Sequence, residues 1–153
     1  MRNTMQIKKY VMACVLLFTA FAVHATDDGN TKTFGDFDVH YSVFPSTFLD
    51  AKIAQAYQIP RAKNETVINI AVRKRLANGK DQAHAAIMAG TSSDLIHDSP
   101  LAFQEIREQD TVYYVAHFRH SQRQLTRFDI SIQPDPNLAA FQLQFSKELF
   151  VDE

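Results

Sequence analysis

The sequence predicts an all-β fold, an immunoglobulin-like antiparallel β-sandwich of about seven strands with one short helix. Apolar and polar residues alternate with a period of two in several segments, which is typical of half-buried strands. Turn-forming residues such as Asn, Asp, Gly and Pro separate these segments at short intervals. Helical spacing occurs clearly in one place only. A small antiparallel β-barrel is the alternative that this pattern leaves open.

The first strand is expected at residues 37–43, where every second residue is apolar. Residues 46–57 then change to helical spacing, which predicts the single helix. Thr47 or Asp50 can cap this helix at its start, and Pro60 ends it. Its apolar face is formed by Leu49, Ile53, Ala56 and Tyr57.

Period two returns at residues 67–75, which predicts a second strand with two unlike faces. One face carries Ile68, Ile70 and Val72, and the other carries Val67, Asn69, Ala71 and Arg73. Asn78-Gly79 follows as a hairpin signal, because both residues tolerate a positive φ. The partner strand is expected at 82–90, although its alanines would also suit a helix. Residues 91–100 are expected to form the longest loop and to cross between the sheets.

The second half of the chain contains only strand patterns separated by short polar turns. In two of these segments the apolar members alternate cleanly, as in Phe128, Ile130 and Ile132, and in Phe141, Leu143 and Phe145. The four expected strands are residues 101–107, 111–120, 125–133 and 138–151.

The N-terminal 25 residues have the pattern of a cleavable secretory signal peptide. Basic residues precede an apolar stretch at 10–23, which is shorter than the roughly 20 residues that span a bilayer. Small residues stand at the positions that a signal peptidase reads in Val23-His24-Ala25. We therefore expect a signal peptide at 1–25, a flexible tether at 26–33 and one sandwich domain at 34–153.

Cleavage would determine both the location and the chemistry of the mature chain. The expected location is the periplasm, with no stable membrane span after cleavage. The only cysteine, Cys14, would be lost, so neither disulfides nor thiol chemistry would remain. The chain has 16 Lys and Arg against 17 Asp and Glu, and loss of Arg2, Lys8 and Lys9 leaves a net charge of −4. An acidic domain without clustered positive charge argues against nucleic acid as a partner.

The first strand carries the candidate binding residues. Asp36, Asp38 and His40 are expected on one face, about 7 Å apart from one to the next, where they could hold a cation or transfer protons. A solvated face of an edge strand has the same pattern. If this strand is an edge, Asp38, His40 and Ser42 would line the site where a partner strand pairs.

The sequence gives less evidence for a metal site or for catalysis than for binding by the first strand. His117 and His120 have a spacing that resembles a ligand pair, but an offset of three on a strand points the rings to opposite faces. No serine lies in a Gly-x-Ser-x-Gly turn, and the four glycines cannot form a phosphate-binding loop. We therefore expect no catalytic residues, no resident metal and no cofactor.

Two segments resemble a known family. They are Phe34-Gly35-Asp36-Phe37-Asp38-Val39-His40-Tyr41-Ser42-Val43-Phe44, continuing into Ser46-Thr47-Phe48-Leu49, and Pro100-Leu101-Ala102-Phe103-Gln104-Glu105-Ile106-Arg107-Glu108 with Tyr113-Tyr114 beyond it. Together they are similar to the domain-of-unknown-function family 4426 (DUF4426), small secreted proteins of Gram-negative bacteria. The resemblance runs from about Phe34 to the C-terminus. It implies a periplasmic all-β domain and supplies no catalytic residues.

These observations favour a non-enzymatic module that binds an unidentified periplasmic or envelope protein. The alternative is a protein that binds a metal or a small ligand through the Asp and His residues of the first strand.

Overall fold

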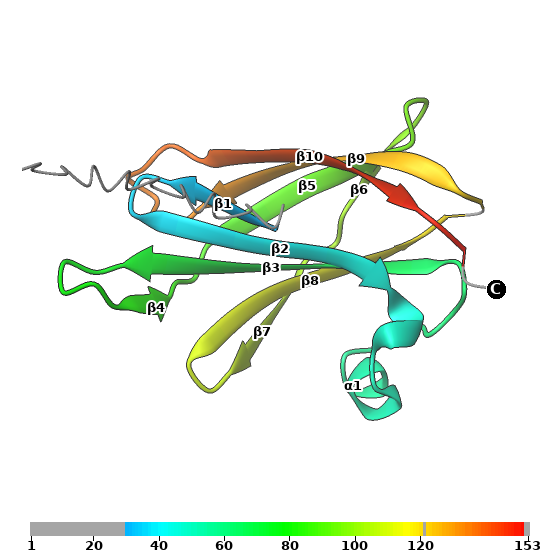
Figure 1. Ribbon diagram of the computed structural model, residues 1–153, viewed down its shortest axis with the longest axis horizontal. Helices are drawn as coiled ribbons and strands as arrows, with labels where there is room; N and C mark the ends of the chain where they lie inside the picture. The colour runs from blue at the N-terminus through cyan, green and yellow to red at the C-terminus, as the bar shows by residue number, and fades with distance from the viewer. Residues whose placement is uncertain (1–29, 121, 152–153) are drawn as a thin grey trace, which may run out of the picture.

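The computed structural model describes residues 30–120 and 122–151, which form ten strands in two antiparallel sheets (Figure 1). Sheet A contains β1 (Thr31–Phe34), β2 (Phe37–Pro45), β3 (Glu65–Arg75), β4 (Asp81–Ala83), β7 (Gln104–Glu108) and β8 (Thr111–Arg119). Sheet B contains β5 (Ile87–Ser93), β6 (Asp98–Pro100), β9 (Gln124–Gln133) and β10 (Phe141–Leu149). The predicted β-sandwich is confirmed, and the described residues form no closed barrel.

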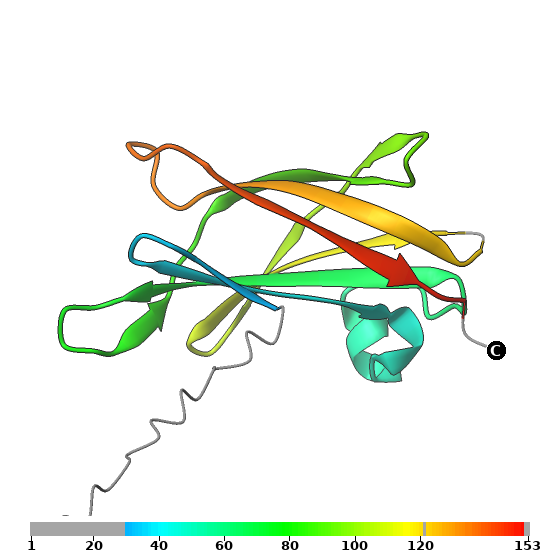
Figure 2. The ribbon, with the colours of Figure 1, turned by 45° about the horizontal axis from the view of Figure 1, so that its top comes forward.

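The two sheets have different strand orders. Sheet A runs β1-β2-β3-β8-β7, with β4 paired to the end of β3, and sheet B runs β10-β9-β5-β6. Figure 2 shows the two sheets as separate layers, with the helical segment beside the end of sheet A. No helix among the described residues has the length and apolar character needed to cross a bilayer.

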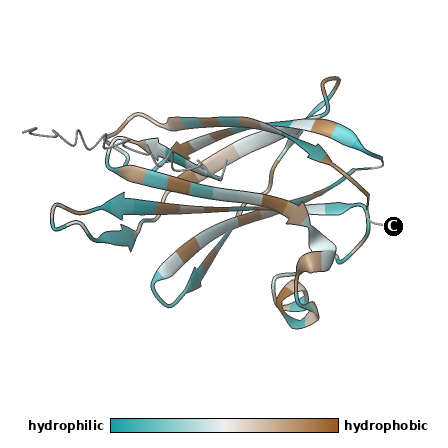
Figure 3. Ribbon diagram, in the orientation of Figure 1, coloured by the Kyte–Doolittle hydropathy of each residue, from teal (hydrophilic) through white to brown (hydrophobic). Residues whose placement is uncertain are grey.

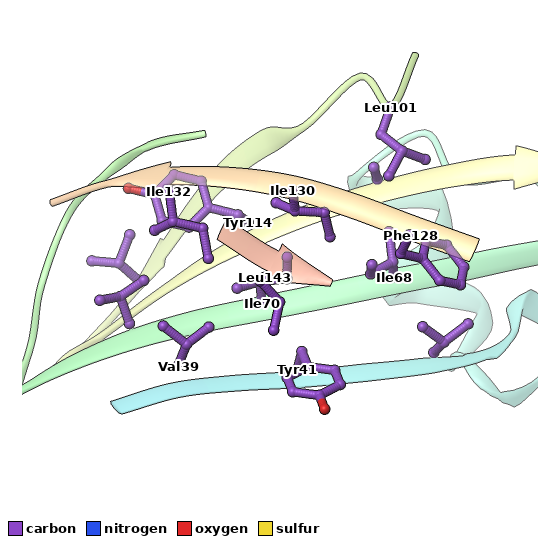
Figure 4. Packing of buried hydrophobic residues seen from close by; sticks show 14 of the residues in the cluster. Val39, Tyr41, Ile68, Ile70, Leu101, Tyr114, Phe128, Ile130, Ile132 and Leu143 are labelled. Atoms are coloured by element: carbon purple, nitrogen blue, oxygen red, sulfur yellow. The ribbon is translucent and has the colours of Figure 1, made fainter. Parts of the chain in front are cut away.

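The core lies between the sheets and is built from alternate residues of the strands. On β3, Ile68, Ile70 and Val72 share one face as predicted, and this face is buried against Phe128, Ile130 and Ile132 of β9. Figure 3 shows the resulting alternation of apolar and polar residues along the strands, and Figure 4 shows the buried side chains meeting between the layers. Since burial of each such side chain contributes about 1.5–3 kcal/mol, this pattern dominates the stability of the fold.

Aromatic rings fill the side of the core nearest β10. Phe145 lies with its ring centroid 4.4 Å from that of Tyr41 and 4.8 Å from that of Phe128. Phe145 is therefore in contact with residues of both sheets, which joins the edge of sheet B to β2.

The strand predicted at 82–90 is divided between the sheets. β4 pairs with β3 in sheet A as the Asn78-Gly79 turn predicts, but β5 joins β9 in sheet B. Residues 84–86 make the crossing, anchored where the amide of His84 donates to the carbonyl of Val72 at 2.8 Å. Gly90 permits the close pairing with β9, because a Cβ there would lie 2.9 Å from the carbonyl oxygen of Asp129.

The expected loop at 91–100 is largely a hairpin. β5 continues to Ser93, and β6 pairs with it from Asp98 to Pro100. The Asp94 carboxylate holds the turn between them by accepting from the amides of Ile96 and His97 at 3.0 and 2.8 Å. The chain returns to sheet A after this hairpin, and β7 begins at Gln104 rather than at residue 101.

The expected helix is shorter than residues 46–57. A 3-10 turn, η1 (Ser46–Phe48), is followed by extended backbone at Leu49, and α1 covers only Ala51–Ala56. Asp50 is the N-cap, and its carboxylate accepts from the amide of Lys52 at 2.8 Å.

The N-terminal predictions are only partly covered by the described residues. The signal peptide and Cys14 lie outside them, as does the first half of the predicted tether, residues 26–29. The prediction was wrong at the end of that tether, because Thr31–Phe34 forms β1 and pairs with β2.

Replacing Ile130 by Ala should lower the free energy of unfolding by about 2–5 kcal/mol, because it removes fully buried methylene and methyl groups. The matched control is Leu125→Ala on the same strand, whose side chain is 49% exposed. This control should change stability by no more than about 0.5 kcal/mol. Urea unfolding followed by circular dichroism would measure both, and equal losses would contradict the assignment of the core face.

Replacing Tyr114 by Phe should cost about 1–3 kcal/mol, because the amide of Ala86 loses its buried acceptor. The Tyr114 hydroxyl accepts from that amide at 2.7 Å and donates to Glu105 at 2.9 Å, which ties the crossing segment to β8. Tyr113→Phe is the neighbouring control on the other face of β8. Urea unfolding of the two variants should show a clear loss for Tyr114→Phe alone.

Candidate functional site

The predicted binding residues lie at the outer face of sheet A and in the turn before it. Asp38, His40 and Ser42 share the outer face of β2, while Phe37, Val39, Tyr41 and Val43 of the same strand point into the core. The prediction for Asp36 was wrong, because it lies in the tight turn between β1 and β2 and not on the strand.

Asp38 has a structural role in this turn. Its carboxylate accepts from Thr33 Oγ1 at 2.6 Å and from Arg75 Nη1 at 3.1 Å. The guanidinium of Arg75 also donates to the carbonyl of Gly35. Asp38 therefore fastens the β1–β2 turn to the end of β3, and its oxygens are already used.

β2 is paired on both sides along its first half and is a sheet edge only beyond the end of β1. Asp38 and His40 lie where β2 is paired on both sides, to β1 and to β3. Ser42 lies beyond the end of β1, but there Lys147 donates from Nζ to the carbonyl of Val43 at 2.7 Å. Lysine caps of this kind protect a sheet edge from pairing.

The histidines are held by separate neighbours. His40 Nδ1 lies 2.9 Å from Thr31 Oγ1, and His117 Nδ1 lies 2.6 Å from the buried Glu65. His120 follows the end of β8, where its Nδ1 donates to the carbonyl of Gln122 at 3.1 Å. In the described parts of the chain, no three or more His, Cys, Asp or Glu side chains are grouped to hold a metal ion.

An apolar pocket lies between the helical segment and the outer face of sheet A, and we call it the α1 pocket. Its volume is about 300 Å³. Apolar and aromatic side chains line it except at Asn69 and Glu108. The lining residues are Phe44, Leu49, Ile53, Tyr57, Ile59, Val67, Asn69, Ile106, Glu108, Tyr113 and Val115.

The helical segment is fastened over this pocket at several points. Ala54 and Ile59 are buried, and the amide of Ile59 donates to the carbonyl of Ala54 at 2.8 Å. Tyr57 donates its hydroxyl to the Glu108 carboxylate of β7 at 2.7 Å. This hydrogen bond, with burial as a smaller cause, raises the pKa of Tyr57 above its ordinary value.

A second hollow of about 370 Å³ lies over the same face and contains two of the predicted residues, His40 and Ser42. We call it the His40 hollow. Asn69 and Tyr113 line both this hollow and the α1 pocket, so the two adjoin across β3 and β8. Its other lining residues are Asn30, Thr31, Tyr41 and Ala71.

Asn69 stands out at this junction. Its Oδ1 atom is buried without a hydrogen-bond partner, and it is the only side-chain polar atom in that state within the described residues. Buried polar atoms in native proteins are nearly always paired, so an unpaired one calls for an explanation.

A larger polar hollow of about 520 Å³ lies between the end of β8 and the β5–β6 hairpin. It is lined by His97, His120 and several serines, and His120 is committed to the carbonyl of Gln122. The α1 pocket is smaller but combines an apolar lining with an unsatisfied polar atom, which makes it the better candidate for specific recognition.

The sequence contained part of the signal for the α1 pocket. The helical spacing of Leu49, Ile53 and Tyr57 predicts an apolar face that must be covered. Val67 on β3 and Val115 on β8 are apolar on the outer face, where strands of a solvated sheet face carry polar residues. Nothing in the sequence indicates that these two apolar surfaces pack together, and no sequence pattern singles out Asn69 as a site residue.

Residues 31–152 match the family described as a domain of unknown function, DUF4426. The chain belongs to the DUF4426 family. It is similar to the crystal structure of a DUF4426 family protein from Pseudomonas aeruginosa PAO1, with 35% identity and a TM-score of 0.70 over 80% of this chain and 95% of that one. No curated protein matches this DUF4426 chain.

Two structures of FetP from uropathogenic Escherichia coli strain F11 are similar in fold. The as-isolated protein, expressed in the periplasm of E. coli, has 10% identity and a TM-score of 0.56 over 80% of this chain and 94% of that one. A copper-bound variant of FetP with a single Glu-to-Gln substitution has 11% identity and a TM-score of 0.55 over 80% and 90%. At this identity the likeness concerns the fold alone.

Replacing Tyr57 by Phe in this DUF4426 chain should loosen α1, because the hydrogen bond from the Tyr57 hydroxyl to the Glu108 carboxylate is lost. Amide exchange at Ile59 should become several-fold faster, while exchange at Ile70 in the core should not change. Since the folded pKa of Tyr57 is raised, this contribution is fully present below pH 10.0 and is lost as pH rises through the raised value. Unchanged exchange at Ile59 would contradict the role of the hydroxyl.

Proposed function

We propose that this protein is a non-enzymatic binding protein of the periplasm, which holds another envelope protein by an apolar side chain inserted into the α1 pocket. The observation that carries the proposal is the pocket itself, an apolar hollow of about 300 Å³ on an otherwise polar sheet face. Pockets that receive one anchoring side chain provide much of the affinity of many protein interfaces.

The surface beside the pocket supports a protein as the occupant. Ile53 lines the pocket and is 48% exposed, and Phe48, next to the lining residue Leu49, is 76% exposed. Large apolar side chains exposed around a hollow are typical of interaction surfaces.

The polar groups of the pocket support binding rather than catalysis. Glu108 is its only carboxylate, and it accepts from Tyr57. The remaining polar groups are the side-chain amide of Asn69 and the hydroxyls of Tyr57 and Tyr113. The lining contains no histidine and no carboxylate other than Glu108, and these are the groups that most often act as general acid or base.

The periplasmic location is supported by the signal-peptide pattern of residues 1–25. An acidic mature chain without cysteine is compatible with that compartment.

Site-specific photo-crosslinking in cells tests this proposal. Benzoylphenylalanine at Ile53 should give a defined crosslinked species in the envelope fraction, because a partner would lie against this position. Leu125 is the matched control, since it is 49% exposed but lies on β9 in sheet B.

A second substitution at the pocket floor, Val115→Arg, should reduce the crosslinking yield at Ile53 at least tenfold, since a charge there blocks an apolar side chain. Circular dichroism would verify that this variant is folded. Equal crosslinking at Ile53 and Leu125, or an Ile53 product that Val115→Arg leaves unchanged, would contradict the proposal.

A further inference from the structure

The α1 pocket has a polar feature that an anchoring side chain must satisfy. Asn69 lies on β3, opposite Ser42 of β2 and Val115 of β8. Its nearest neighbours on the same face of β3 are Val67 and Ala71, which provide no donor. Asn69 therefore lines an apolar pocket and has a buried Oδ1 atom without a hydrogen-bond partner.

We infer that the α1 pocket recognises an aromatic side chain that ends in a hydrogen-bond donor, tryptophan or tyrosine, with Asn69 Oδ1 as the acceptor. This inference rests on the proposed function and specifies the partner residue. In the free protein the oxygen is buried, so binding requires the Asn69 amide to turn toward the pocket that its own side chain lines.

Other side chains fit this pocket less well. A purely aliphatic side chain would fill the apolar space but leave Oδ1 unpaired. Lysine or arginine would bring a charge into an apolar lining whose only carboxylate, Glu108, already accepts from Tyr57. Tryptophan and tyrosine combine a large apolar body with one donor at the far end, and three aromatic rings line the pocket in Phe44, Tyr57 and Tyr113.

Small-molecule probes of these side chains test the inference without an identified partner. The mature protein would be titrated with indole and with 1-methylindole, which differ in the ring N–H. A second pair is 4-methylphenol and 4-methylanisole. Chemical shifts of the backbone amides of Ile106 and Val115 and of the Asn69 side-chain amide would report binding.

We expect indole to bind about 5- to 100-fold more tightly than 1-methylindole, because only indole satisfies the buried acceptor. The phenol should show the same preference over its ether. In Asn69→Leu the preference should fall to within about twofold, because no acceptor remains. Asn69→Asp, which keeps an acceptor at the same place, should retain the preference and provides a test if Asn69→Leu does not fold.

Ser42→Ala is the matched control, since it removes a polar group from the adjoining His40 hollow and should leave the preference unchanged. Equal affinities for indole and 1-methylindole would overturn the inference while leaving an apolar pocket as the binding site. If Asn69→Leu still binds indole more tightly than 1-methylindole, another group must be the acceptor, and the inference would be overturned. Absence of binding by all four probes would overturn it too, and the crosslinking at Ile53 would then decide separately whether a partner occupies the pocket.

Discussion

The structure depends on the burial of alternate apolar side chains from β3 and β9 in one core between the sheets. This constraint determines which face of each strand points inward, because a shift of one residue would expose the whole apolar set. The same constraint decides what remains outside. On β3, burial of Ile68 and Ile70 places Val67 and Asn69 on the outer face, and the site is built from that face.

The segment around α1 covers part of the outer face of sheet A without forming a second hydrophobic core there. Val67 and Val115 are too apolar for a solvated face, and next to the segment around α1 Val67 is buried and Val115 is half-buried. The cover is held at its C-terminal end by buried Ile59 and by the Tyr57–Glu108 hydrogen bond, and a hollow remains beneath it. The pocket under this incomplete cover is lined by apolar side chains and by Asn69, whose side-chain Oδ1 atom has no hydrogen-bond partner.

Sequence patterns predicted which residues share a face of a strand, but they did not predict which strands lie next to each other. His40 and Ser42 were expected to share a face, and they line one hollow. Asp38 was expected to bind a partner, but it fastens a turn through Arg75, a residue 37 positions away in the chain. Strand edges are decided by long-range pairing, which local alternation does not encode. The division of residues 82–90 between the two sheets is likewise a matter of long-range pairing, since β4 pairs with β3 and β5 pairs with β9.

The sequence by itself determined the fold class, the inward faces of the long strands and the position of the hairpin at Asn78-Gly79. These properties follow from period-two burial and from local backbone preference, which each segment carries alone. Only the tertiary structure decided which strands are neighbours, how far α1 covers sheet A, and that Asn69 Oδ1 is buried without a donor. Those properties depend on contacts between distant segments, so no single stretch of the chain contains them.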